Sequence, residues 1–182
     1  MFKVRIENPF LRGLVEWILV IGLALLLALI ARSFLFRITR VTGYSMEPSL
    51  SHGDVLILNR FTYLFRSPAV GDIVAFPYPK DPSDFFIKRV VAVSGDTVDF
   101  HNSQFWVNGL PLDDSFSVVP VLSIGDMNFP VTVEEGHLFL LGDNRNVSRD
   151  SRCTTVGTVP ESEMLGKVFI RFWPISSFGR VE

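Results

Sequence analysis

Two short segments of the chain carry side chains whose chemistries complement each other. Ser45 lies in the segment 44–49 (YSMEPS), and Lys88 lies in the segment 86–91 (FIKRVV). A serine hydroxyl is a weak nucleophile at neutral pH and needs a base to take its proton. Histidine is the usual base, but a desolvated lysine can replace it once its pKa has fallen toward neutrality. Ser45 and Lys88 are therefore candidates for a nucleophile and its base.

Each of these residues, taken alone, also has an ordinary structural explanation. Ser45 lies close to Gly43 and Pro48, a neighbourhood that is typical of a turn. Lys88 and Arg89 point to opposite faces of a strand, so one of them faces inward if one sheet face is buried. An inward arginine would stay charged because its pKa is above ~12, and only the lysine could be tuned to act as a base.

A third polar segment, 142–152 (GDNRNVSRDSR), follows the apolar run 138–141 (LFLL). An exposed loop, with Asp and Asn side chains capping its turns, is one interpretation. We favour an ordered loop that packs against polar groups, since Arg–Asp pairs at this spacing can brace a loop through bidentate hydrogen bonds.

The N-terminal part of the chain predicts a membrane anchor. Residues 17–31 (WILVIGLALLLALIA) carry no charge, and the apolar stretch extends to 14–36 with charges only near its ends. A bilayer core needs about 20 helical residues, and charges near a helix end can reach the interface. Arg32 and the bulky residues 34–36 replace the small residues of a cleavage site, so we expect an uncleaved anchor rather than a signal peptide.

The remainder of the 182-residue chain, 37–182, predicts one β domain of short strands separated by turns. We therefore expect a mainly β fold, with one transmembrane helix followed by an antiparallel, barrel-like or sandwich-like domain. Seven strands are expected within 54–59, 73–77, 85–93, 97–100, 104–107, 137–141 and 165–173.

A less patterned insert, 110–135, interrupts the expected strands and would form a small β subdomain or a flap. Its adjacent acids, Asp113 and Asp114, would point to opposite faces of a strand and could not act as a pair there. We expect a solvated turn at this position.

Composition argues against several classes of function. The net charge is −2 and there is no basic run, which gives no reason to expect nucleic-acid binding. His52, His101 and His137 lie far apart without metal-ligand spacing, and Cys153 is the single cysteine. No nucleotide motif is present either, so we predict neither a metal nor another cofactor.

Four segments, in this order behind the apolar span, resemble the bacterial type I signal peptidases. They are 41–50 (VTGYSMEPSL), 71–76 (GDIVAF), 86–91 (FIKRVV) with 95–96 (GD), and 142–152 (GDNRNVSRDSR). That family consists of membrane-anchored Ser–Lys endopeptidases that remove signal peptides from exported proteins. The resemblance covers the anchor and nearly the whole β region.

The resemblance implies a role for each matching residue. Ser45 is the expected nucleophile, Lys88 the expected general base, and Ser148 the serine that orients the lysine. Structural support is expected from Asp143, Asp150 and Arg152. The backbone N–H of Ser45 is one expected oxyanion donor; Gly43, where some members have a serine, leaves the second donor open.

The family cuts after small residues in an Ala-x-Ala pattern, which implies shallow apolar pockets beside an extended substrate. The resemblance implies that the pocket walls are formed by Val41, Met46, Leu50, Phe86 and Ile87. Ordinary core packing is an equally good explanation for any one of these side chains.

The resemblance also implies a location. Three basic residues precede the span and three follow it, so charge alone leaves the topology open. By resemblance, residues 1–13 are a short cytoplasmic N-terminus, and the catalytic domain lies on the extracytoplasmic face of a bacterial plasma membrane. The expected partners are preprotein signal peptides and the lipid bilayer, and we expect a monomer.

Three alternatives stay open at this point. Self-cleaving repressors of the SOS type use the same Ser–Lys chemistry, but they carry a DNA-binding domain where this chain has an apolar span. An anchored β module without enzymatic activity would tolerate loss of Ser45 and Lys88. A specialised peptidase that matures a dedicated secretion, pilus or conjugation substrate would share every catalytic residue.

Overall fold

The computed structural model describes residues 9–117 and 121–181, except for the side chains of residues 9, 30–34 and 83. Most of the expected N-terminal segment 1–13 lies outside the described residues. The chain divides into two units, residues 1–36 and 37–182, which are described separately.

The described residues of the first unit form one helix, α1 (Pro9–Leu35). Its stretch Phe10–Leu29 is long and apolar enough to cross a membrane. The helix begins earlier than the predicted span 14–36, and Phe36 is already the first residue of β1 rather than the last of the helix.

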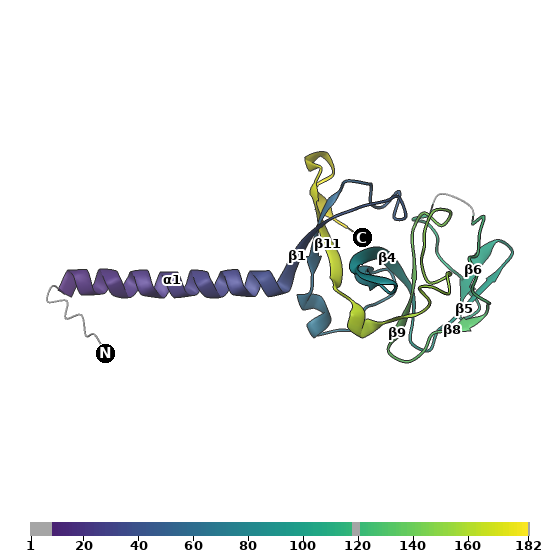
Figure 1. Cartoon of the computed structure of the whole chain (residues 1–182), viewed down its shortest axis with the longest axis horizontal. Helices are drawn as coiled ribbons and strands as arrows, with labels where there is room; N and C mark the ends of the chain where they lie inside the picture. The colour runs from purple at the N-terminus through teal and green to yellow at the C-terminus, as the bar shows by residue number, and fades with distance from the viewer. Residues whose placement is uncertain (1–8, 118–120, 182) are drawn as a thin grey trace. The chain divides into compact units, whose positions relative to one another are not determined.

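The second unit contains two antiparallel sheets, shown in Figure 1. The larger sheet has the strand order β1-β2-β11-β3-β4-β9-β10, with β12 paired to β11. Its strands are β1 (Phe36–Arg40), β2 (Val55–Asn59), β3 (Ile73–Tyr78), β4 (Asp81–Val93), β9 (His137–Leu141), β10 (Val159–Pro160), β11 (Gly166–Trp173) and β12 (Gly179–Arg180). Three short 3-10 helices complete this part of the chain: η1 (Phe61–Leu64), η2 (Glu161–Glu163) and η3 (Ile175–Ser177).

The smaller sheet has the order β7-β6-β5-β8 and lies at one end of the β domain, away from β1 (Figure 1). Its strands are β5 (Thr97–His101), β6 (Gln104–Val107), β7 (Leu110–Pro111) and β8 (Val131–Thr132). The predicted insert 110–135 therefore begins with β7 and includes β8 near its end. Between β7 and β8 its described residues form no further strand.

Both faces of the larger sheet are covered. On β3, Ile73 and Ala75 pack into one core cluster, whereas Val74 and Phe76 pack into another. A strand that is buried on both faces reads as a continuous apolar run, which is what β3 shows. A third apolar cluster joins the smaller sheet to β4 and β9.

The predicted fold class is confirmed: the structure is mainly β, with antiparallel sheets and one N-terminal apolar helix. One of Lys88 and Arg89 is expected to face inward if a single sheet face is buried, but this sheet does not meet that condition. Both side chains are buried, because the sheet is covered on both faces. The solvated turn expected at Asp113 and Asp114 is wrong for Asp114, whose carboxylate is paired with the buried Arg145.

Candidate active site

Ser45 and Lys88 meet in the folded chain. Ser45 lies in the turns between β1 and β2, and Lys88 lies on β4. The Lys88 Nζ atom is 2.8 Å from the Ser45 Oγ atom, within hydrogen-bond distance. A base this close to a hydroxyl has the geometry needed to take its proton.

Burial adapts the lysine to this role. Lys88 is 3% exposed, and its Nζ atom also donates a hydrogen bond to the Ile87 carbonyl at 2.9 Å. Burial lowers the Lys88 pKa to about 8; the charges of Asp150 and Asp143 oppose this shift, and that of Arg152 adds to it. Loss of hydration disfavours the ammonium form, so the neutral amine becomes available near neutral pH.

The backbone around Ser45 is fixed on both sides. The Asn144 N–H donates to the Ser45 carbonyl at 3.0 Å, and the Gly43 N–H donates to the His52 Nδ1 atom at 3.1 Å. The Ser45 N–H itself has no hydrogen-bond partner among the described residues. This donor is therefore free to bind an oxyanion, whereas the N–H of Gly43 is already occupied.

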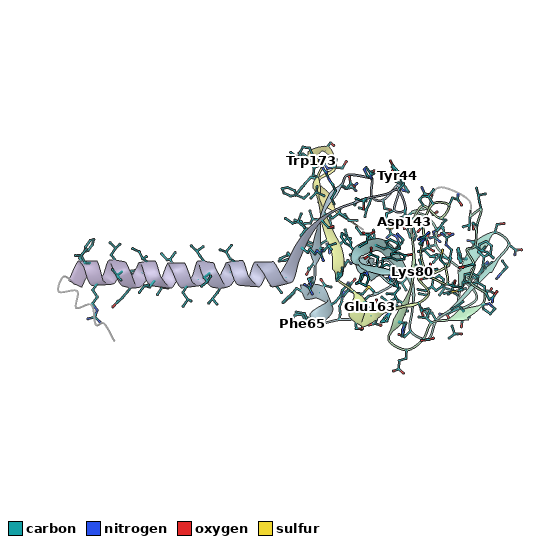
Figure 2. All side chains as sticks on the ribbon, viewed as in Figure 1. Tyr44, Phe65, Lys80, Asp143, Glu163 and Trp173 are labelled. Carbon is teal, nitrogen blue, oxygen red and sulfur yellow. The ribbon has the colours of Figure 1, made fainter. Side chains whose placement is uncertain are left out.

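The loop 142–152 is tied to β4 by an ion pair. Arg89 donates from Nε and Nη2 to the two carboxylate oxygens of Asp143, at 2.9 and 2.8 Å. Arg89 also donates to the Gly71 carbonyl and the Ser49 hydroxyl. Figure 2 shows Asp143 within the body of the β domain, consistent with its complete burial. Asp143 therefore links the loop to β4.

A second ion pair closes the loop on itself. Arg152 donates from Nε and Nη2 to the two carboxylate oxygens of Asp150, at 2.8 and 3.0 Å. The same carboxylate accepts the Gly142 N–H at 3.1 Å. This pair links the two ends of the loop.

Gly142 lies where the loop approaches the nucleophile most closely. A Cβ atom at this position would lie 2.2 Å from the Ser148 Oγ atom and 2.4 Å from the Ser45 carbonyl oxygen. Only a glycine fits such a contact without displacing the backbone of Ser45. From the sequence, Gly142 could be recognised only as part of the motif 142–152. Its role depends on a contact with Ser45, which is distant in the sequence.

Ser148 lies beside Gly142, and its buried hydroxyl has no hydrogen-bond partner among the described residues. The hydrogen bonds of Lys88 go to Ser45 and Ile87 instead. A lysine-orienting role for Ser148 stays a prediction.

A pocket of about 310 Å³ opens at the dyad. Four of the five predicted wall residues line it: Val41, Met46, Phe86 and Ile87. Leu50 does not line it, since this side chain is fully buried in the core cluster that also contains Val41 and Met46.

The pocket has further lining residues that the sequence did not reveal, among them Arg40, Tyr44, Phe85, Val147 and Arg149. Tyr44 is 58% exposed and lies at the margin of the β domain (Figure 2). These residues lie within or next to the motifs, but only the fold shows that they share one pocket.

No cluster of His, Cys, Asp or Glu that could hold a metal ion occurs among residues 9–117 and 121–181.

Comparison with known proteins identifies the family. The family model for signal peptidase, peptidase S26, matches residues 14–173. The chain belongs to this family. Among its relatives, a probable signal peptidase I-1 of Synechocystis sp. is 36% identical, over 87% of this chain and 82% of the relative. A signal peptidase IB of Staphylococcus aureus is 32% identical, over 92% of this chain and 93% of the relative.

A solved structure is also similar. It is a signal peptidase I from Enterococcus faecalis V583, with 29% sequence identity and a TM-score of 0.48, covering 57% of this chain and 97% of that chain. Membership of the signal peptidase family makes the chain a serine peptidase, and the four motifs predicted from the sequence all fall within the matched residues.

Proposed function

We propose that this chain is a membrane-anchored endopeptidase that removes N-terminal signal peptides from exported preproteins. Ser45 is the nucleophile and Lys88 the general base. The observation that carries the proposal is the 2.8 Å contact between the Lys88 Nζ and Ser45 Oγ atoms, formed by a lysine that is almost completely buried.

The reaction begins with a neutral Lys88. The amine accepts the Ser45 proton while Oγ attacks the substrate carbonyl, and it later gives that proton to the leaving amine. The free N–H of Ser45 donates to the oxyanion of the tetrahedral intermediate. A water molecule then hydrolyses the acyl-enzyme, with Lys88 again acting as the base.

The pocket supports a preference for small apolar residues near the cleavage site. Its walls include the apolar side chains Val41, Met46, Phe86 and Ile87 beside the dyad. An extended substrate segment with alanine at alternate positions would fit shallow walls of this kind. We therefore expect cutting after Ala-x-Ala sequences.

The helix α1 supports membrane anchoring. Its stretch Phe10–Leu29 is long enough to span a bilayer, and the β domain begins directly after it. In this proposal the chain crosses a bacterial plasma membrane once, acts as a monomer, and exposes residues 37–182 on the extracytoplasmic face. An enzyme held beside the membrane-embedded signal peptide gains effective concentration.

The test is cleavage of preproteins by the full chain in lipid vesicles, followed by sequencing of the product's N-terminus. Wild type should cut after an Ala-x-Ala site, and Ser45→Ala, Lys88→Met and Lys88→Arg should each lose roughly 10³-fold or more in kcat/KM. The Lys88→Arg variant keeps the positive charge but cannot supply a neutral base. Variants that cut as well as wild type would exclude the dyad.

The substrate panel distinguishes general from dedicated processing. General signal peptidase activity predicts cutting of several unrelated preproteins. Cutting of a single pilus, conjugation or secretion substrate would instead make the chain a specialised Ser–Lys peptidase.

A further inference from the structure

The insert between β7 and β8 contacts three arginines at the loop 142–152: Arg89, which binds Asp143 of the loop, and Arg145 and Arg152, which belong to it. The ring of Phe116 lies 4.1 Å from the Arg89 guanidinium carbon, and the Asp114 carboxylate is 2.6 Å from Nη2 of Arg145. The Ser123 carbonyl accepts a hydrogen bond from Nη1 of Arg152 at 2.7 Å. These contacts come from two described stretches, 114–117 and 121–127, which we call the insert brace.

Backbone contacts extend the insert brace along the loop. The Leu122 N–H donates to the Asn146 side-chain oxygen at 2.9 Å, and the N–H groups of Asp126 and Met127 donate to the Arg152 carbonyl at 3.1 and 3.0 Å. A Cβ atom on Gly125 would lie only 2.2 Å from that carbonyl oxygen. The insert and the loop therefore form one closely packed unit.

Arg145 depends on the insert for its ion pair. Its side chain is fully buried, and Nε and Nη1 have no hydrogen-bond partner within the described residues. Asp114 is the carboxylate that forms an ion pair with Arg145 in this part of the chain. Removing one partner of a buried pair leaves an uncompensated buried charge, which forces the surroundings to rearrange.

The effect of such a rearrangement reaches the dyad through short contacts. The Arg145 carbonyl accepts Nη2 of Arg152 at 2.6 Å, and Arg152 holds Asp150. Asp150 in turn accepts the Gly142 N–H, and Gly142 packs against the Ser45 backbone. Each link is a hydrogen bond or a close packing contact.

We propose that the insert is a positioning element for the Ser45–Lys88 dyad, and that Asp114 is its principal positioning residue. The carboxylate fixes Arg145, and through it the loop that packs on the Ser45 backbone. This role rests on the proposed function of the dyad, but it concerns the insert, whose residues take no part in the chemical steps.

A positioning role should change the proton affinity of Lys88. The charged groups that face this lysine are Asp143, Asp150 and Arg152, and the last two belong to the braced end of the loop. A loosened loop would admit water to a lysine whose low pKa is due chiefly to burial. The Lys88 pKa should then rise, and less of the enzyme would hold the neutral base at pH 7.

The activity test compares Asp114→Asn, Asp114→Glu and the matched control Asp113→Asn in the full chain. Asp113 is the exposed neighbour, and within the described residues its carboxylate accepts only the nearby Ser115 N–H. Asp114→Asn should lower kcat at pH 7 by about ten-fold with little change in KM. In a plot of kcat against pH, the acid limb should move to higher pH by about one unit. Above pH 9 the difference in kcat between Asp114→Asn and wild type should become smaller.

Asp114→Glu should recover most of the lost activity, and Asp113→Asn should behave as wild type. As a second variant that leaves every charge in place, Gly125→Ala should show the same displaced acid limb. A purely structural role predicts a different result: an equal fractional loss at every pH, matching the unfolded fraction seen by circular dichroism. That result, or an unchanged profile, would overturn the proposal.

A second readout works without any substrate. The Lys88 side chain of the full chain in detergent micelles can be titrated by ¹³C NMR, with its signal assigned by loss in Lys88→Met. The proposal predicts a higher midpoint in Asp114→Asn than in wild type, and an equal midpoint contradicts it. If wild type cuts no preprotein, the proposed function fails, while this titration still decides whether the insert positions the lysine.

Discussion

Lys88 and Arg89 are neighbours on β4 and are equally buried, each 3% exposed, yet their surroundings differ. Arg89 forms a bidentate ion pair with Asp143. Lys88 contacts a hydroxyl and a carbonyl, and no carboxylate in the described part of the chain pairs with it. The comparison shows that burial alone does not decide what a cation does. Arg89, which is paired with a carboxylate, links β4 to the loop 142–152. Lys88, which has no such partner, has a pKa lowered by burial.

The largest effect should appear when each cation is replaced by methionine. Arg89→Met leaves the buried Asp143 carboxylate without its partner and should lower the free energy of unfolding by about 3–5 kcal/mol. Lys88→Met removes a buried cation that has no ion pair, and it should not lower stability at pH 7. Urea unfolding of both variants in micelles, followed by circular dichroism, measures the difference.

The control for this contrast is the double variant Arg89→Met/Asp143→Leu. Because it removes both buried charges, it should recover most of the stability lost in Arg89→Met. Equal destabilisation by Arg89→Met and Lys88→Met would show that the two cations play the same structural part.

A slightly smaller effect should appear in the pH dependence of stability. Burial lowers the Lys88 pKa from 10.5 to about 8, so between these values the unfolded state binds more protons than the folded state. The free energy of unfolding should therefore rise with pH through this window, by about 3 kcal/mol in total. Below pH 8 the lysine is protonated in both states, and the gain is absent.

This contribution is measured as the difference between wild type and Lys88→Met across pH 7 to 11. Subtraction removes the other groups that titrate in the same range. Parallel stability curves for the two proteins would mean that the lysine titrates with its ordinary pKa.

The smallest of these effects concerns the contact between the loop and Ser45. Gly142→Ala places a methyl group within 2.4 Å of the Ser45 carbonyl oxygen, so the nucleophile must move. A misplacement near 1 Å costs on the order of 10²-fold in rate, and kcat should fall by about that factor. Gly179→Ala is a matched control because a Cβ atom there meets nothing within 4 Å. Similar kinetics for both variants would remove Gly142 from the positioning of the dyad.

Much of the fold could be predicted because its signals are local. The expected strands 104–107 and 137–141 match β6 and β9 residue for residue, since turn residues bracket both apolar runs. The apolar helix was equally clear. Its ends were less so, because the end of a hydrophobic run does not fix where a helix stops and a strand begins.

The dyad could be predicted from motifs, but its environment could not. Whether Lys88 or Arg89 faces inward depends on what covers each sheet face, and that coverage comes from distant segments. The pair Asp114–Arg145 was missed for the same reason: 31 residues separate its members. Leu50 was assigned to the pocket because it lies in a motif, whereas the fold buries it.

The most direct test of the account is the pH dependence of kcat/KM for cleavage of a preprotein by the full chain. A neutral Lys88 is required, and its pKa is about 8, so activity should rise about ten-fold per pH unit below an acid limb near pH 8 and then level off. A profile that is flat from pH 6 to 10, or one whose acid limb lies near 10.5, would contradict a buried lysine as the base.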